Sequence, residues 1–292
     1  METGTPSRTA EAIAAARAFG SHLYRSLGIL DDPYAQYFLR PKFYKRLVLV
    51  RRLSVGPGRS MFLRFYERKH PGALGWALCR HRYMDDLIKE AVGEGVSQVV
   101  LLGAGYDTRA FRLGLPNAVS ILEIDHPATQ AVKLKVIRNR FGQPPDNASY
   151  LPMDVTATNL RQVVGAAGFD ARRPTLFVLE GFLWYLEPSV ATEILRSIKW
   201  IAPSGSSLVA DYVLPEVVEG GASASADAQA HRELSRRWGE PILSGIEPTQ
   251  LGAYLRDVDM RLTDDVGPDE LASRYGAVSM HPYFRIMRAE IE

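Results

Sequence analysis

The chain has 292 residues and a formal net charge of +2, and 46% of its residues are hydrophobic, which is typical of a globular protein with a sizeable core. Its single cysteine, Cys79, excludes an internal disulfide, a cysteine-ligated zinc site and a paired redox motif. No run of residues has the apolar character of a secretory leader or a membrane span, so we expect a cytoplasmic protein without a membrane partner.

Residues 1–75 are predicted to form an N-terminal helical cap. Residues 7–27 are rich in alanine, and Asp32 followed by Pro33 is typical of a capped helix start. Residues 40–69 hold ten lysines and arginines against one acid, a net +9 that leaves −7 for the rest of the chain. Solvated helix faces are the simpler interpretation, but such a segment also attracts acidic partners. It lacks the aromatic pattern of single-strand binders, so we expect no nucleic-acid partner.

From residue 76 the pattern changes to short apolar strands that alternate with helices. A helix is predicted over 76–94. The predicted strands cover 97–102, 118–124, 149–152, 174–180 and 206–213. The helices between them cover 127–141, 156–167 and 188–201. This alternation predicts one α/β domain over 76–292, with a mostly parallel, doubly wound sheet.

The alternation stops after the fifth predicted strand. Residues 214–247 are interpreted as a cap or lid insertion, and the small, polar residues 219–231 within it are predicted to form a mobile loop. The remaining elements are expected at 248–256 (helix), 258–264 (strand), 268–275 (helix) and 283–288 (strand).

The first strand ends in the most informative turn of the chain, Gly103-Ala104-Gly105-Tyr106-Asp107-Thr108. Glycines let a backbone turn tightly and approach a ligand closely. A dinucleotide fingerprint needs a third glycine where Thr108 stands, so an NAD-dependent oxidoreductase is an alternative but a weaker one. An adenosyl cofactor that lacks a pyrophosphate has a looser requirement for glycine.

Acids follow the next strands at their carboxyl ends, where open α/β sheets bind ligands. Glu123 and Asp125 lie on the same side of the second strand, about twenty residues after Gly105, which is the spacing of a ribose-binding carboxylate. We favour Asp125, which is nearer to the strand end. Alternatively, these acids cap the helix that begins at Pro127.

Two further strand ends carry acids. Asp154 and the backbone of Val155 suit adenine, although Asp154 equally suits the cap of a helix beginning at 156. Glu180 ends an apolar strand, where a carboxylate needs a cation or a donor such as a ligand's ammonium group. The aromatic residues 182, 184 and 185 suit a wall against such a cation, or ordinary core packing.

Together these motifs resemble the leucine carboxyl methyltransferase, or PPM1-type, family of S-adenosylmethionine-dependent O-methyltransferases, which are common in actinobacteria and in natural-product pathways. The matching segments are 80–86 (RHRYMDD), 101–109 (LLGAGYDTR), 123–127 (EIDHP), 153–155 (MDV) and 180–186 (EGFLWYL). The resemblance implies a Rossmann-like class I methyltransferase fold, with an N-terminal helical cap and a lid insertion after the fifth strand. It also implies S-adenosylmethionine as the cofactor and S-adenosylhomocysteine as the product.

The resemblance assigns the cofactor's parts to particular residues. Arg80 would bind the carboxylate of the methionine moiety, a role for which Arg82 competes, and a guanidinium suits a carboxylate. Glu180 with Gly181 would face the amino group. Gly103 would line the methionine moiety, Asp125 would hold the ribose, and Asp154 with Val155 would read the adenine. The other predicted cofactor-binding residues are Ala104, Gly105, Asp107 and Glu123.

The sequence says less about the methyl acceptor than about the cofactor. The basic segment favours an anionic acceptor, either a carboxylate of a small molecule such as a natural-product acid or the carboxylate of a protein C-terminus. A carboxylate needs no general base because its pKa is about 4. A phenol or alcohol needs one, for which His126, His231 and His281 are conceivable. Tyr185 and His126 are the candidate acceptor-site residues. A non-catalytic, cofactor-binding regulatory protein is the alternative from another class. The sequence leaves the oligomeric state open.

Overall fold

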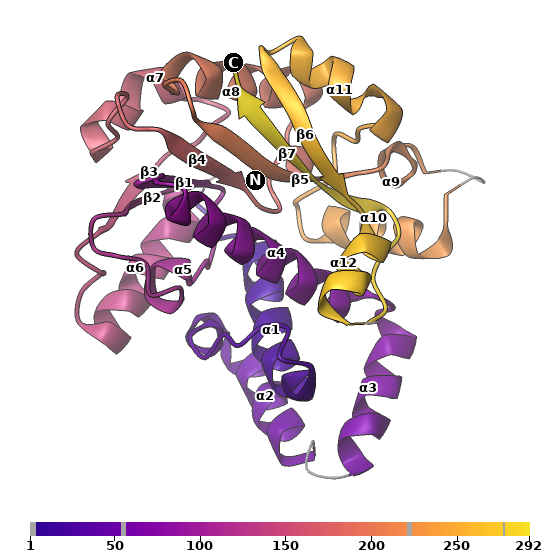
Figure 1. The fold of residues 1–292 in the computed structure, drawn as a ribbon. Coiled ribbons are helices and arrows are strands. Elements are labelled where there is room, and N and C mark those ends of the chain that lie inside the picture. The colour runs from indigo at the N-terminus through magenta and orange to yellow at the C-terminus, as the bar shows by residue number, and fades with distance from the viewer. Residues whose placement is uncertain (1–3, 54–56, 221–223, 277) are drawn as a thin grey trace.

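The computed structural model describes residues 4–53, 57–220, 224–276 and 278–292. Within these residues a seven-stranded sheet has the order β3-β2-β1-β4-β5-β7-β6 (Figure 1). Its strands are β1 (Gln98–Leu102), β2 (Ser120–Asp125), β3 (Ala148–Pro152), β4 (Thr175–Leu179), β5 (Ser207–Val213), β6 (Met260–Val266) and β7 (Phe284–Ile291). Strands β1 to β5 are parallel, and β7 runs antiparallel to β5 and β6. The predicted α/β fold with a mostly parallel sheet is confirmed.

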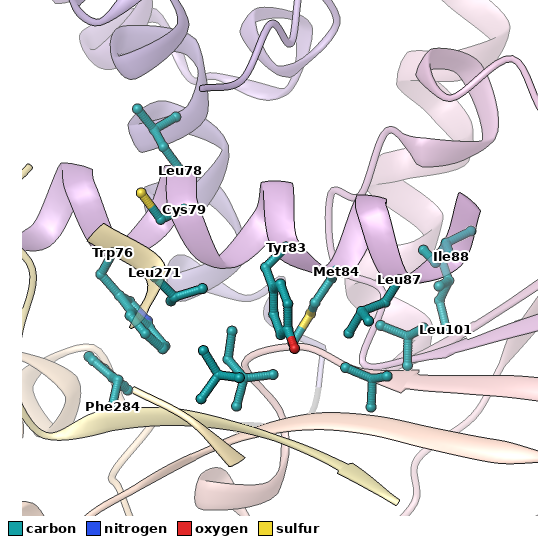
Figure 2. Packing of buried hydrophobic residues seen from close by; sticks show 14 of the residues in the cluster. Trp76, Leu78, Cys79, Tyr83, Met84, Leu87, Ile88, Leu101, Leu271 and Phe284 are labelled. Atoms are coloured by element: carbon teal, nitrogen blue, oxygen red, sulfur yellow. The ribbon is translucent and has the colours of Figure 1, made fainter. Parts of the chain in front are cut away.

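Helices cover both faces of the sheet, which is why β1 and β4 are buried along their whole length. One face packs against α4 (Ala73–Gly93) and α12 (Pro268–Tyr275), and the other against α8 (Pro188–Ile201) and α11 (Pro248–Arg256). Figure 2 shows Trp76, Tyr83 and Met84 pointing from α4 toward the strands, while Leu78 points to the opposite side of the helix. The side of α4 that carries Trp76 therefore belongs to the core.

Several helices begin at a proline, whose fixed φ angle and missing N–H suit the first turn. Besides α8, α11 and α12, this group includes α6 (Pro127–Phe141) and the short α9 (Pro215–Glu219). Three other short helical turns stand at Arg25–Leu27, Ala35–Phe38 and Leu183–Tyr185, and α5 covers Arg109–Arg112. Among the residues described here, no helix combines the length and the apolarity that crossing a membrane requires.

The N-terminal helices are α1 (Arg8–Leu23), α2 (Pro41–Leu53) and α3 (Pro57–Lys69). Helix α1 packs so closely on α4 that a Cβ on Gly20 would lie 2.6 Å from the side chain of Leu78. Helix α2 packs on α1 and α3 packs on α2, and both stand away from the sheet (Figure 1). The predicted boundary at residue 75 falls inside α4, which begins at Ala73. This helix packs on both α1 and the sheet. The division of the chain at that point stays a prediction.

Two predicted elements are wrong in part. The helix expected over 156–167 begins only at Leu160, where Asn159 caps α7 (Leu160–Val163), and a 3-10 turn over Val164–Ala167 completes it. The loop expected over 219–231 is helical from residue 226, because Ser225 caps α10 (Ala226–Arg237) by accepting a 3.2 Å hydrogen bond from the backbone of Ala228. Residues 221–223 of that predicted loop lie outside the described residues.

Candidate active site

A cavity of about 930 Å³ lies where β1, β2, β3 and β4 end. This volume is near the upper end of the range for small-molecule sites, so it has room for a cofactor and a second ligand. Its wall includes nearly all of the predicted site residues: Arg80, Gly103, Ala104, Gly105, Asp107, Asp125, His126, Asp154, Val155, Glu180, Gly181 and Tyr185. The topology therefore brings together residues from four strand ends and one helix.

The glycine turn has a backbone that other residues rarely adopt. Gly103 has φ of +69°, and a Cβ there would lie 2.4 Å from the ring of Phe182. The backbone N–H groups of Gly103 and Ala104 both donate to the carbonyl of Ile124, at 2.9 and 3.2 Å. The missing Cβ therefore lets β1 turn beside β2 and leaves the backbone open to the cavity.

Asp125 is tied to the glycine turn. Its carboxylate accepts hydrogen bonds from the backbone N–H of Gly105 and from that of His126, the latter at 2.5 Å. Burial raises the pKa of Asp125, although these two N–H groups oppose the shift. Asp125 lines the cavity with its position fixed by the turn, which is the placement that a ribose-binding carboxylate needs.

Glu123, also predicted as a ribose ligand, does not line the cavity. Its side chain is fully buried and pairs with Nζ of Lys133 from α6, and burial raises the pKa of Glu123 to about 7. The period-two alternation correctly places Glu123 and Asp125 on one side of β2, but Glu123 lies two residues deeper, under α6. The prediction for Glu123 is therefore corrected to an ion pair that holds α6 on the sheet.

Asp154 and His126 each make a local turn at the edge of the cavity. Asp154 Oδ1 accepts from the backbone of Thr156 at 3.0 Å and from its hydroxyl at 2.7 Å, and the hydroxyl contact is the main cause that lowers the pKa of Asp154. Asp154 therefore does not cap a helix at 156, and both Asp154 and Val155 line the cavity. His126 caps α6, because its Nδ1 accepts from the backbone of Ala128 at 3.3 Å.

A buried network of charges closes the inner end of the cavity around Glu180. Arg80 Nε lies 2.9 Å from Glu180, Arg109 Nη2 lies 2.7 Å away and His81 Nδ1 lies 3.0 Å away. Burial opposes ionisation of Glu180, but the contacts with His81, Arg109 and Arg80 outweigh it and hold the pKa of Glu180 well below its usual value. Arg80 was predicted to bind the cofactor's carboxylate and Glu180 its amino group, and in the structure these two residues pair with each other.

Asp211 of β5 is a member of this network that sequence reasoning missed. Its Oδ2 lies 2.6 Å from Arg80 Nη1, and its Oδ1 accepts from the backbone of Gly181 at 2.7 Å. Burial raises the pKa of Asp211 to about 6, against the opposing charge of Arg80. The signal in the sequence that could have pointed to Asp211 is an acid in the middle of a buried apolar strand.

Arg82, the other residue predicted to bind the cofactor's carboxylate, pairs with Asp86 on the surface at 2.9 Å instead.

Arg109 stands where a cation would otherwise be held. Ligand atoms of His81, Asp107 and Glu180 lie within 4.8 Å of one another, which is a spacing that suits a metal ion. The guanidinium of Arg109 contacts all three, at 3.0, 2.5 and 2.7 Å, and also pairs with Asp85 at 2.7 Å. The cluster is therefore a structural ion network built on an arginine.

Aromatic rings form another part of the cavity wall. Trp76 stacks on Phe284 with ring centroids 4.8 Å apart, and Trp184 lies 5.3 Å from the same ring. His231 and His281 stack nearby, 6.1 Å apart. Burial lowers the pKa of each histidine to about 4, so both are neutral at pH 7. Within the described structure, neither Nδ1 atom has a hydrogen-bond partner.

This donor set fits an adenosyl cofactor. The glycine turn admits a ligand close to the backbone, Asp125 and Asp154 offer carboxylate oxygens at successive strand ends, and Glu180 offers a charge deep in the cavity. These features define a Rossmann-like methyltransferase. Residues 10–199 match the leucine carboxyl methyltransferase family, and the chain belongs to that family.

The relatives agree. A Mycolicibacterium gilvum protein, whose name assigns it to the S-adenosyl-L-methionine-dependent methyltransferases, is 35% identical over 77% of this chain and 72% of its own length. A similarly named protein from Mycobacterium sp. (strain KMS) is 28% identical over 93% of this chain and 89% of its own. The protein is thus an S-adenosylmethionine-dependent methyltransferase.

Solved structures share the fold. A DUF574 family protein from Streptomyces avermitilis superposes with a TM-score of 0.62 at 14% identity, covering 95% of this chain and 97% of its own. A Thermobifida fusca protein described among the methyltransferases gives 0.60 at 16% identity, covering 100% and 97%.

Proposed function

We propose that the protein methylates a carboxylate oxygen of a small anionic molecule. The observation that carries the proposal is that one cavity has in its wall both the glycine turn at Gly103 and two cationic residues of the N-terminal helices, Arg46 and Lys69. S-Adenosylmethionine supplies a methyl group activated by its sulfonium, which a carboxylate oxygen attacks in line. The protein therefore has to align the two ligands and exclude water.

The inner wall would hold the cofactor. Asp125 would accept from the ribose hydroxyls, and Asp154 with the backbone of Val155 would bind the adenine edge. Arg80 and Glu180, which now neutralise each other, would each keep one partner in the protein while meeting the carboxylate and the ammonium group of the methionine moiety. Asp211 would hold Arg80 in place during that exchange, because it contacts both Arg80 and the backbone of Gly181.

A carboxylate acceptor loses no proton during the reaction, so the site needs no general base. Its pKa of about 4 leaves it ionised at pH 7. The surplus of positive charge on α2 and α3 raises the local concentration of anions. A hydroxyl acceptor is the second candidate, because His231 and His281 lie in the cavity wall and their neutral rings can accept a proton, although a pKa of about 4 makes each of them a weak base.

The test is transfer of a labelled methyl group to acids and phenols of matched size, followed by mild alkali. Methyl esters release the label as methanol in alkali, whereas methyl ethers of phenols retain it. Alkali-labile product supports the proposal, and alkali-stable product supports the hydroxyl alternative. Tight binding of S-adenosylhomocysteine without transfer to any acceptor would favour a regulatory protein.

A further inference from the structure

The cavity extends well beyond the residues assigned to the cofactor. From the inner wall it follows α1, where Ala12, Ala15 and Ala16 line it with small side chains. It then reaches α2 and α3, which contribute Leu49 and Phe65 to its wall. The same space therefore joins the predicted cofactor-binding residues to an opening lined by exposed side chains of α2 and α3. These two helices stand away from the sheet (Figure 1).

The opening is apolar and faces water. Leu49 is 52% exposed and Phe65 is 63% exposed, although both are large hydrophobic side chains. Deeper in the same wall, Phe43 and Phe62 are half-buried and Val50 is buried. An apolar surface that continues from solvent into a cavity gains most from a ligand that covers all of it.

Cations stand among these apolar groups. The guanidinium of Arg46 lies 5.7 Å from the ring centroid of Phe43, and Nζ of Lys69 lies 5.9 Å from that of Phe65. Both cations line the cavity. Glu67 is the one acid of the basic segment 40–69, and it does not line the cavity. Its carboxylate accepts hydrogen bonds from the hydroxyl of Tyr24 at 3.3 Å and from the backbone of Gly72 at 3.0 Å. The opening therefore suits amphiphilic anions, which combine a negative charge with an apolar part.

We propose that the acceptor is an elongated amphiphilic acid, whose carboxylate reaches the methyl donor while its apolar chain lies along α1 and leaves between α2 and α3. Arg46 and Lys69 attract the acid at the opening, and Leu49 and Phe65 cover the outer part of its chain. A compact acid would leave this length of wall uncovered. The carboxylate as the reacting group rests on the proposed function, whereas the binding path rests on the cavity alone.

The test is a series of unbranched carboxylates from butanoate to hexadecanoate, bound to the full-length protein in the presence of S-adenosylhomocysteine. Binding is measured by equilibrium dialysis with labelled acids, so that no turnover is needed. Affinity should rise about fourfold for each added methylene until the chain passes Leu49. Equal affinity across the series would overturn the inference.

Two substitutions with a matched control locate the chain. Leu49→Asp and Phe65→Asp should each weaken hexadecanoate binding by about tenfold or more and flatten the dependence on chain length. Leu27→Asp is the control, because Leu27 is 49% exposed but lies outside the cavity wall. It should leave the affinity within twofold of the original, and melting temperatures show whether each variant is folded. Loss of affinity in Leu27→Asp equal to that in Leu49→Asp would contradict the proposed path.

The same acids separate this inference from the proposed function. A dependence on chain length without methyl ester would leave the binding path standing and refute carboxylate methylation. If butanoate were esterified as efficiently as hexadecanoate, carboxylate methylation would stand and the proposed binding path would be refuted. Presenting hexadecanoate in phosphatidylcholine vesicles identifies its source: unchanged occupancy indicates extraction from a bilayer, and a fall in proportion to partitioning indicates uptake from water.

Discussion

Arg109 Nη2 lies 2.7 Å from Glu180, so the helix that follows the glycine turn is held to the end of β4 by a buried ion pair. The same guanidinium also neutralises Asp85 and Asp107. Three carboxylates at the base of the active site thus share one arginine, although Arg80 also contacts Glu180 and Arg112 also contacts Asp85.

Arg109→Met should lower the free energy of unfolding by about 3 to 5 kcal/mol, because it leaves buried carboxylates without their main counter-charge. Urea denaturation measures the loss. Arg172→Met is the control: Arg172 pairs with Asp170 at 2.9 Å, but its side chain is 89% exposed, and this variant should unfold at the original urea concentration. Equal midpoints for the two variants would show that the buried network does not stabilise the fold.

Gly103→Ala should weaken S-adenosylhomocysteine binding by tenfold or more. A Cβ at this position meets the ring of Phe182 and the backbone has a positive φ, which costs about 1 to 2 kcal/mol for a residue other than glycine. Calorimetric titration gives the affinity. Gly93→Ala, at the end of α4, places its Cβ in open space and should bind normally. Normal binding by Gly103→Ala would remove the glycine turn from the cofactor site.

Asp125→Asn and Glu123→Gln should separate binding from stability. The first removes a carboxylate from the cavity wall and should lower S-adenosylhomocysteine affinity by about tenfold to a hundredfold. The second leaves the wall intact but removes the partner of Lys133, so it should lower the melting temperature while the affinity stays within twofold. If the affinities changed in the opposite order, Glu123 would be the ribose ligand after all.

Acid should destabilise the protein through His231 and His281. Their pKa values fall from 6.5 to about 4 on folding, so between these values the unfolded chain binds more protons. Stability from both groups is fully present above pH 6.5 and is lost as the pH falls toward 4. His231→Gln should therefore flatten the dependence of the unfolding free energy on pH in that window. A wild-type stability that is constant from pH 6.5 to 4 would contradict the burial of these rings.

The positions of Asp125, Asp154 and Glu180 could be predicted because parallel strands end at one edge of a sheet, whatever the helices between them do. Their partners could not. Arg80 meets Asp211 only after β5 has taken its place beside β4, and strand order is not written in local sequence. Glu123 was assigned to the cofactor because alternation gives the side of a strand that a residue faces but not its depth.

The loop predicted at 219–231 is wrong from residue 226 for a related reason. Small, polar residues lower helix propensity only slightly, and the cap at Ser225 with packing at Ala228 is enough to form α10. Propensity is a weak guide where tertiary contacts supply the missing stability.

Helix α4 carries Trp76 in the aromatic wall, Arg80 and His81 in the charged network, and Met84 in the core of the sheet. One inserted residue between Trp76 and Arg80 would turn these side chains by about 100° relative to one another. Such an insertion would take Arg80 away from Glu180 while both halves of the helix remained helical. We therefore expect random single-residue insertions and deletions to abolish methyl transfer throughout residues 76–84, a stretch in which many point substitutions that preserve volume would be tolerated.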